Sequence, residues 1–218
     1  RTYYQAYQLA FDLAKRAERC YQFELGVPSA KFLQYGHWDN TRKGLLAGDK
    51  LMHDIRRMEV AHRDNNRREY ELTKQISLEL TDPVSLQQLR ETGSCTIRLD
   101  ESLFDLDHPS HYMRRIKAVR LSMPAVTGPY TPVTGTLSLA TSTIRVEPDR
   151  SNDPVAAPGG GTTRIAISHA QSDAGMFEAN LRDERYLPFE GKGVISLWSL
   201  ELPALRQFDY RTISDVVL

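Results

Sequence analysis

Apolar residues recur at steps of three and four along the first part of the chain. The spacing predicts a helix ending near residues 26–28, with one face made by Tyr3, Tyr7, Ala10, Ala14, Ala17 and Tyr21. An aromatic linker follows (Phe32, Tyr35, Trp38), and a second helix is expected to begin within 41–48 and to continue to Ile76. Two antiparallel helices of this kind would form a helical hairpin or coiled-coil arm.

The apolar period changes from 3.6 to 2 after Gly93. Asp82-Pro83 ends the second helix and 84–90 is expected to form a short third one, whereas Cys95, Ile97 and Leu99 alternate with polar residues as in a half-buried strand. Further strands are predicted at 116–123, 136–146, 163–168, 176–181, 194–202 and 213–218. Short strands separated by Gly, Pro and Asp turns are typical of an antiparallel β-sandwich.

These patterns predict an α+β protein with a helical segment at 1–92 and a β-sandwich at 93–218. A long loop rich in Pro and Gly is expected at 147–163. The chain begins without Met and ends on three apolar residues, 216–218, so we expect it to be a fragment of a larger protein.

The charge balance disfavours nucleic acid or a membrane surface as the partner of the whole chain. Lys plus Arg number 28 and Asp plus Glu number 28, so there is no net attraction to phosphates or anionic lipid. Acidic residues interleave with the basic run at 56–68, which indicates a solvated helix face. The two cysteines, Cys20 in a predicted helix and Cys95 in a predicted strand, are expected to be separate buried thiols, with a disulfide or a metal pair as the alternative.

One stretch has the density of a metal site, namely Asp105, Asp107, His108 and His111. Its spacing matches no known ligand signature, so a metal is the less favoured reading. We expect instead that the carboxylates cap turns or pair with Arg114 and Arg115, and that His111 and Tyr112 pack beneath them.

No catalytic arrangement stands out. Ser110-His111 and Ser168-His169 are adjacent in sequence, and adjacent residues of a strand point to opposite faces. The glycines at 159–161 are followed by neither Lys-Ser/Thr nor a helix, so they indicate a linker. We therefore predict no enzyme activity, no cofactor and no metal.

Four residues are candidates for a partner interface. Pro129 and Tyr130 lie in a turn stiffened by prolines, and Arg185 and Tyr186 are of the types enriched in interface hot spots. For the second pair a structural ion network at 183–190 is the favoured reading, and the interface is the alternative. Stacking of sugars on Trp198, Tyr186 and Tyr130 would make the domain a carbohydrate-binding sandwich instead.

Several long motifs occur in an order that resembles the C-terminal end of the A component of bacterial Tc toxins. They lie at 3–7, 21–26, 44–51, 65–74, 91–95, 103–107, 111–117 and 126–131, and in the block 176–218 that opens Met-Phe-Glu-Ala-Asn-Leu-Arg-Asp-Glu-Arg. Ser110 stands where the family usually has glycine, and the 147–163 loop departs from the family pattern.

The resemblance implies a non-enzymatic role in a secreted, insecticidal pore-forming complex. In this family five A chains assemble around a helical channel, and their C-terminal domains dock the propeller of the B component so that a toxic polypeptide can be translocated. The expected partners are thus the B component and further copies of the chain. A β-sandwich adaptor of a non-toxin secreted assembly is the alternative.

Overall fold

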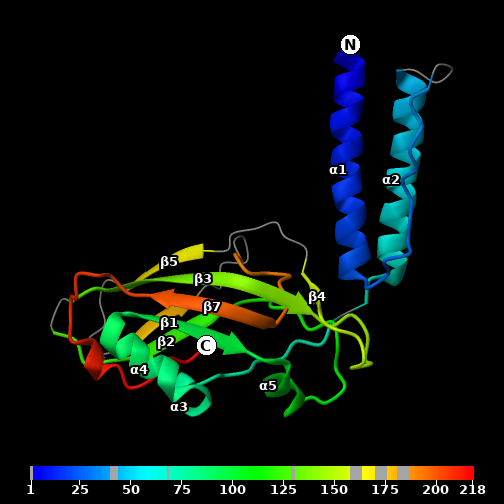
Figure 1. Ribbon diagram of the computed structural model, residues 1–218. Coiled ribbons are helices and arrows are strands. Elements are labelled where there is room, and N and C mark those ends of the chain that lie inside the picture. Colours follow the sequence, from blue (N-terminus) through cyan, green and yellow to red (C-terminus); the bar gives the residue numbers. More distant parts are fainter. Residues whose placement is uncertain are drawn as a thin grey trace. The chain divides into compact units, whose positions relative to one another are not determined.

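The chain folds into two compact units, residues 1–71 and 72–218. The computed structural model describes residues 2–39, 44–67, 69–128, 131–157, 164–169, 176–180 and 187–218 (Figure 1). It is an α+β protein with antiparallel strands, as the sequence patterns predict. None of the helices in these ranges is long and apolar enough to cross a membrane.

The first unit contains helices α1 (Thr2–Glu24) and α2 (Leu45–Asn65), which run parallel, so the prediction of two antiparallel helices is wrong. Their C-terminal ends lie together, because His62 near the end of α2 is 3.6 Å from Glu24 at the end of α1. Residues 25–39, here called the return segment, run back along the two helices and contact both α1 and α2 (Figure 1). Two parallel helices require the chain between them to run back along the full length of α1, which is roughly 35 Å. The roughly 20 residues between α1 and α2 can span this distance, since an extended residue covers up to about 3.3 Å.

The buried face of α1 differs from the predicted one. Ala14, Glu18 and Tyr21 are buried, and Tyr7 and Phe11 are half-buried. Of the predicted positions Tyr3, Ala10 and Ala17 are exposed. The small apolar cluster of this unit joins α1, the return segment and α2 through Ala14, Leu33 and Leu51.

Helix α2 is shorter than expected, because it ends at Asn65 and not near Ile76. The amide of Asn66, in extended conformation, donates to His62 O and caps the helix. Ile76 instead exchanges backbone hydrogen bonds with Leu218 at the far end of the chain. The tertiary pairing in the second unit therefore determines the conformation of this segment.

The second unit begins with α3 (Leu78–Thr81) and α4 (Pro83–Thr92). Asp82 caps α4 by accepting from the Ser85 amide at 3.1 Å, and Gly93 ends it in the left-handed conformation at φ 81°. Two further helical turns, α5 (Glu101–Asp105) and the 3-10 turn η1 (Tyr210–Thr212), were not predicted.

The main sheet of the second unit has five strands. Strand β7 (Ile195–Glu201) lies between β1 (Ser94–Leu99) and β3 (Val133–Ile144), and β4 (Val155–Ala156) and β5 (Arg164–His169) both pair with β3. All these pairs are antiparallel.

A second sheet pairs β2 (Arg120–Pro124) with β6 (Met176–Asn180). The C-terminal segment extends it, because Val217 bridges Ser122 on one side and Ser77 on the other. The predicted strand at 213–218 is thus present as these bridges and not as a full strand.

The strands enclose one apolar core. Cys95, Ile97 and Leu99 are buried, which confirms the alternation predicted for β1. Side chains of both sheets and of α4 belong to this cluster, among them Leu121, Met123, Leu137, Leu139, Trp198, Leu200 and Val216. Because α3 and α4 contribute Leu78, Leu86 and Leu89, the two units divide between residues 71 and 72 and not at the expected position near 92–93.

Candidate functional site

The four predicted interface residues lie outside the described part of the structure. Pro129 and Tyr130 fall between the described residues Gly128 and Thr131, and Arg185 and Tyr186 fall between 180 and 187. Their assignment to the partner interface therefore stays a prediction from the sequence.

The acidic and histidine stretch after β1 forms ion pairs. Arg114 Nη2 donates to Asp105 Oδ1 at 2.7 Å, as predicted, and Asp107 pairs with Lys74. The hydrogen bond from Lys74 is the main reason why the pKa of Asp107 lies below its ordinary value. Within the described residues no three His, Cys, Asp or Glu side chains are close enough to hold a metal ion.

The two histidines of this stretch do not pack beneath the carboxylates. His108 and His111 stack on each other with ring centroids 5.4 Å apart and planes 8° apart. His111 and Tyr112 are exposed, so the expectation that they are buried is wrong. Ser110 and Met113 have positive φ angles of 64° and 54°, and this backbone turns the two side chains outward.

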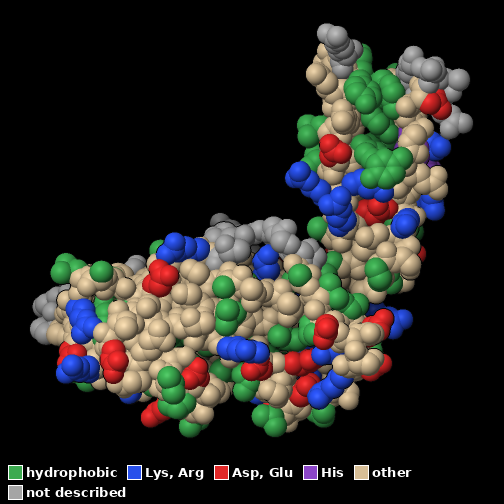
Figure 2. All heavy atoms as spheres, in the orientation of Figure 1, with side chains coloured by type: hydrophobic (Ala, Val, Ile, Leu, Met, Phe, Trp, Pro, Cys, Tyr) green, Lys and Arg blue, Asp and Glu red, His purple; other side chains and the backbone are tan. Residues whose placement is uncertain are grey.

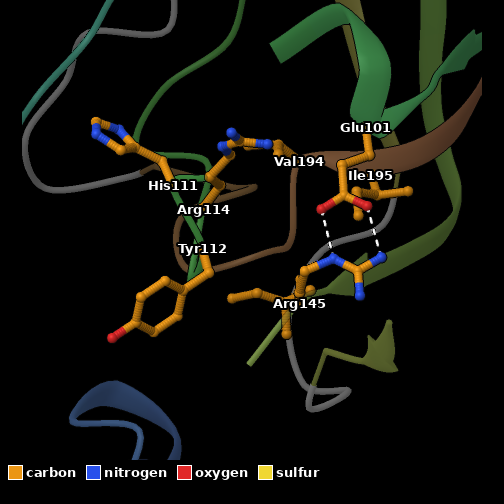
Figure 3. A pocket seen from close by; sticks show the side chains of 8 residues that line it. Glu101, His111, Tyr112, Arg114, Arg145, Val194 and Ile195 are labelled. Carbon is orange, nitrogen blue, oxygen red and sulfur yellow. Dashed lines mark hydrogen bonds and ion pairs between the residues drawn. The ribbon is translucent and has the colours of Figure 1, made fainter. Parts of the chain in front are cut away.

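A second ion pair joins α5 to the end of β3. Both guanidinium nitrogens Nε and Nη2 of Arg145 donate to Glu101, each at 2.7 Å (Figure 3). This hydrogen bonding, with the charge of Arg145, lowers the pKa of Glu101 although burial opposes the shift. Arg145 also donates to the carbonyls of Asp149 and Asn152, so one side chain holds the start of the 147–163 loop.

The two ion pairs border a shallow hollow in the surface, with enclosed space for no more than about one water molecule. Its lining comprises Glu101, His111, Tyr112, Arg114, Ile144, Arg145, Val194 and Ile195 (Figure 3). Nη1 of Arg114 is buried there without a protein partner. In this lining Glu101 is paired with Arg145, and Arg114 is paired with Asp105 through Nη2.

Trp198 cannot stack on a sugar, which removes the main residue of the carbohydrate hypothesis. Its side chain is 1% exposed, its ring packs edge-on against Phe189 at 4.7 Å, and its Nε1 donates to Ser196 Oγ at 2.8 Å. The other two residues of that hypothesis, Tyr130 and Tyr186, lie outside the described residues.

The two cysteines are separate thiols, as expected, but the expectation that both are buried is wrong for Cys20. Cys20 is exposed on α1, whereas Cys95 is buried in the core of the second unit. Burial, assisted by the charge of Asp82, raises the pKa of the Cys95 thiol to about 12. A thiol with this pKa is neutral at physiological pH and unsuited to nucleophilic catalysis.

Sequence reasoning missed two buried carboxylates in the first unit. Glu18 of α1 and Asp54 of α2 are only 4% and 6% exposed, and both bind the return segment. The helical spacing of Glu18 from Ala14 and Tyr21 was a usable signal, because it places this carboxylate on an apolar face. For Asp54 no comparable signal exists, since its partner His37 is remote in sequence.

Exposed apolar side chains gather on the helices of the first unit (Figure 2). On α1 they form a second stripe at spacings of three and four, made by Tyr3, Ala6, Ala10, Leu13, Ala17 and Cys20, all exposed. The first stripe, through Phe11 and Ala14, packs inside the unit. Helix α1 therefore has two apolar stripes, and among the described residues of the first unit only one of them is covered.

Comparison with known proteins identifies the family. A family model described as the Tc toxin complex TcA C-terminal TcB-binding domain matches residues 1–218. The toxin subunit YenA2 of Yersinia entomophaga is 32% identical over 240 residues, which cover 99% of this chain and 17% of YenA2. The cryo-EM structure of Morganella morganii TcdA4 has the same fold, with a TM-score of 0.67 and 21% identity over 94% of this chain and 10% of TcdA4. The chain thus spans less than a fifth of the length of these relatives, and it belongs to the family of TcB-binding domains at the C-terminus of the Tc toxin A component.

Proposed function

We propose that this domain is a non-enzymatic docking module of a secreted, insecticidal-type Tc toxin. It binds the propeller region of the B component so that the toxic polypeptide can enter the channel of the A component. The observation that carries the proposal is the match of a TcB-binding family model to all 218 residues. Membership of the family favours a toxin over an adaptor from a non-toxin assembly.

The second unit has the packing expected of a rigid platform on which a partner protein can dock. We propose that its two sheets form a β-sandwich, since side chains from β2, β3 and β7 share one core. A core packed from two antiparallel sheets holds its surface loops in fixed positions, which lowers the entropic cost of binding a partner.

A docking role without catalysis agrees with the chemistry of the described residues. Glu101 and Asp105 are neutralised by Arg145 and Arg114, and the Cys95 thiol is buried and neutral. Side chains that are paired in this way stabilise loops and are not available to a substrate.

Binding of the immobilised B component to the 218-residue chain tests the docking role. We expect Tyr130→Ala and Tyr186→Ala to weaken binding by about tenfold or more, because buried aromatic side chains dominate interface energies. Tyr112→Ala is a matched control, since Tyr112 is a tyrosine too, is 49% exposed and was not assigned to the interface. Absence of binding by the parent chain would refute the function, and unchanged affinity of both variants would refute only the residue assignment.

We further propose that copies of the chain associate through the uncovered stripe of α1, and that the assembly is a pentamer in the full-length protein. A stripe with alternating steps of three and four is the pattern by which helices of different chains pack. Ala6, Ala10 and Ala17 leave room for the close approach of a neighbouring helix, and Leu13 supplies apolar area.

Sedimentation at tens of micromolar measures this association. Leu13→Glu places a charge in the stripe and should shift the chain toward monomer, whereas Gln8→Glu adds the same charge at an exposed position of α1 outside the stripe and should not. A parent chain that sediments only as a monomer, or equal behaviour of both variants, would contradict the proposal.

A further inference from the structure

The return segment is held on α1 and α2 by carboxylates as well as by aromatic contacts. Glu18 Oε1 accepts from the amides of Phe32 at 2.6 Å and Leu33 at 2.8 Å. Its other oxygen accepts from Lys15 Nζ at 2.8 Å, and Lys15 also donates to Leu33 O at 2.6 Å. One ionised carboxylate of α1 therefore binds two consecutive backbone amides of the return segment.

A second buried carboxylate acts from α2. Asp54 Oδ2 and His37 Nε2 share a hydrogen bond of 2.8 Å, and His37 is 2% exposed. The other charged or titratable groups that face Asp54 are His53 at 3.8 Å and Arg57 at 3.5 Å on α2, and Tyr7 on α1. Both helices thus use an acidic side chain to hold the same segment.

Aromatic rings complete the attachment and provide a reporter. Phe32 packs edge-on against Tyr21 at 5.1 Å, and Trp38 lies 5.2 Å from Tyr7 and 5.3 Å from Tyr4. These contacts do not depend on pH. The environment of the Trp38 ring will nevertheless change when the end of the return segment leaves the helices.

We propose that acid detaches the return segment from α1 and α2 while the two helices remain folded. Protonation removes the charge with which Glu18 holds the Phe32 and Leu33 amides and Lys15. The helices keep their own backbone hydrogen bonds, and α1 and α2 also contact each other directly. Release would uncover the faces of α1 and α2 that the return segment covers, without unfolding the unit.

The electrostatics of Glu18 gives the direction and range of the pH effect. Burial alone would raise the pKa of Glu18, but the hydrogen bonds from Leu33, Lys15 and Phe32 outweigh it, so the pKa is lowered. A lowered pKa in the attached state means that the stabilisation of attachment by Glu18 is fully present at neutral pH and is lost progressively as the pH falls below 4.5, where a free Glu carboxyl titrates. Between the free and attached pKa values, the detached fraction should rise by up to about tenfold per pH unit.

Fluorine NMR of the 218-residue chain labelled with 5-fluorotryptophan tests the proposal. The chain has two Trp residues, so Trp38 gives one resonance and Trp198, in the second unit, gives an internal reference. Trp38→Phe assigns them. On acidification from neutral pH to about pH 3 we expect the Trp38 resonance to shift while helical circular dichroism is retained.

Two variants separate the proposal from general acid unfolding. Glu18→Gln cannot become charged, so it should show the detached Trp38 signal already at neutral pH and little further change on acidification. Glu24→Gln removes an exposed carboxylate of the same helix and should behave as the parent. The proposal is overturned if Trp38 does not respond to acid, if helicity is lost together with the Trp38 shift, or if Glu18→Gln follows the parent titration.

Discussion

Gly193 precedes β7 at a position where no side chain fits. A Cβ built on it would lie 1.9 Å from the backbone oxygen of Thr143 and 2.5 Å from its carbonyl carbon. Thr143 belongs to β3 and pairs with Ile195, so both backbones are fixed by the ladder of the main sheet. The substitution Gly193→Ala must therefore displace one strand from the other.

The size of the displacement sets the expected cost. Real Cβ atoms essentially never approach another atom closer than 3.0 Å, so the strands must separate locally by about 1.1 Å, the difference between 3.0 and 1.9 Å. Overpacking by one methyl group costs about 1–3 kcal/mol, and each weakened ladder hydrogen bond adds about 0.5–1.5 kcal/mol. We expect a loss of about 3–5 kcal/mol in the free energy of unfolding, or roughly 10 °C or more in Tm.

Urea unfolding followed by fluorescence measures this loss. In a Trp38→Phe background the buried Trp198 alone reports on the second unit. Gly48→Ala is the matched control, because Gly48 lies within α2 with nothing within 4 Å of a new Cβ. It should stabilise the first unit by about 0.5–1 kcal/mol. A Gly193→Ala protein whose second unit unfolds within about 0.5 kcal/mol of the parent would refute the reasoning.

Three further outcomes follow from the geometry. Ser110→Gly should raise the stability of the second unit by up to about 1 kcal/mol in thermal unfolding, because φ at Ser110 is 64° and glycine adopts this conformation without strain. Equal or lower stability would contradict this. Cys20 should react with a thiol reagent in the native protein and Cys95 only after unfolding, since burial raises the pKa of Cys95 to about 12; two fast-reacting thiols would disprove it. Glu101→Gln should cost about 2 kcal/mol at neutral pH in urea unfolding, because Arg145 holds the pKa of Glu101 low. The difference from the parent should shrink below pH 4.5, where a free Glu carboxyl titrates, and a difference that does not depend on pH would count against it.

The sequence determined those features that depend on residues close to one another along the chain. Alternation at Cys95, Ile97 and Leu99 placed the core face of β1 correctly, because side chains of a strand point to opposite faces in turn. The short helix expected at 84–90 is present as α4 (Pro83–Thr92), and the structure shows that Asp82 and Gly93 cap its two ends. The family could also be recognised, since its motifs are contiguous stretches of the chain.

The tertiary structure alone decided how remote segments pair. An aromatic linker between two amphipathic helices is compatible with a short turn or with a long return, and only the contacts of Glu18, Phe32 and Trp38 make α1 and α2 parallel. Likewise Ile76 is not helical, because its backbone is hydrogen-bonded to that of Leu218, the last residue of the chain. The periodicity of apolar residues shows which face of a helix or strand is apolar. It does not show which other helix or strand packs against that face, because this depends on contacts between segments that are remote in sequence.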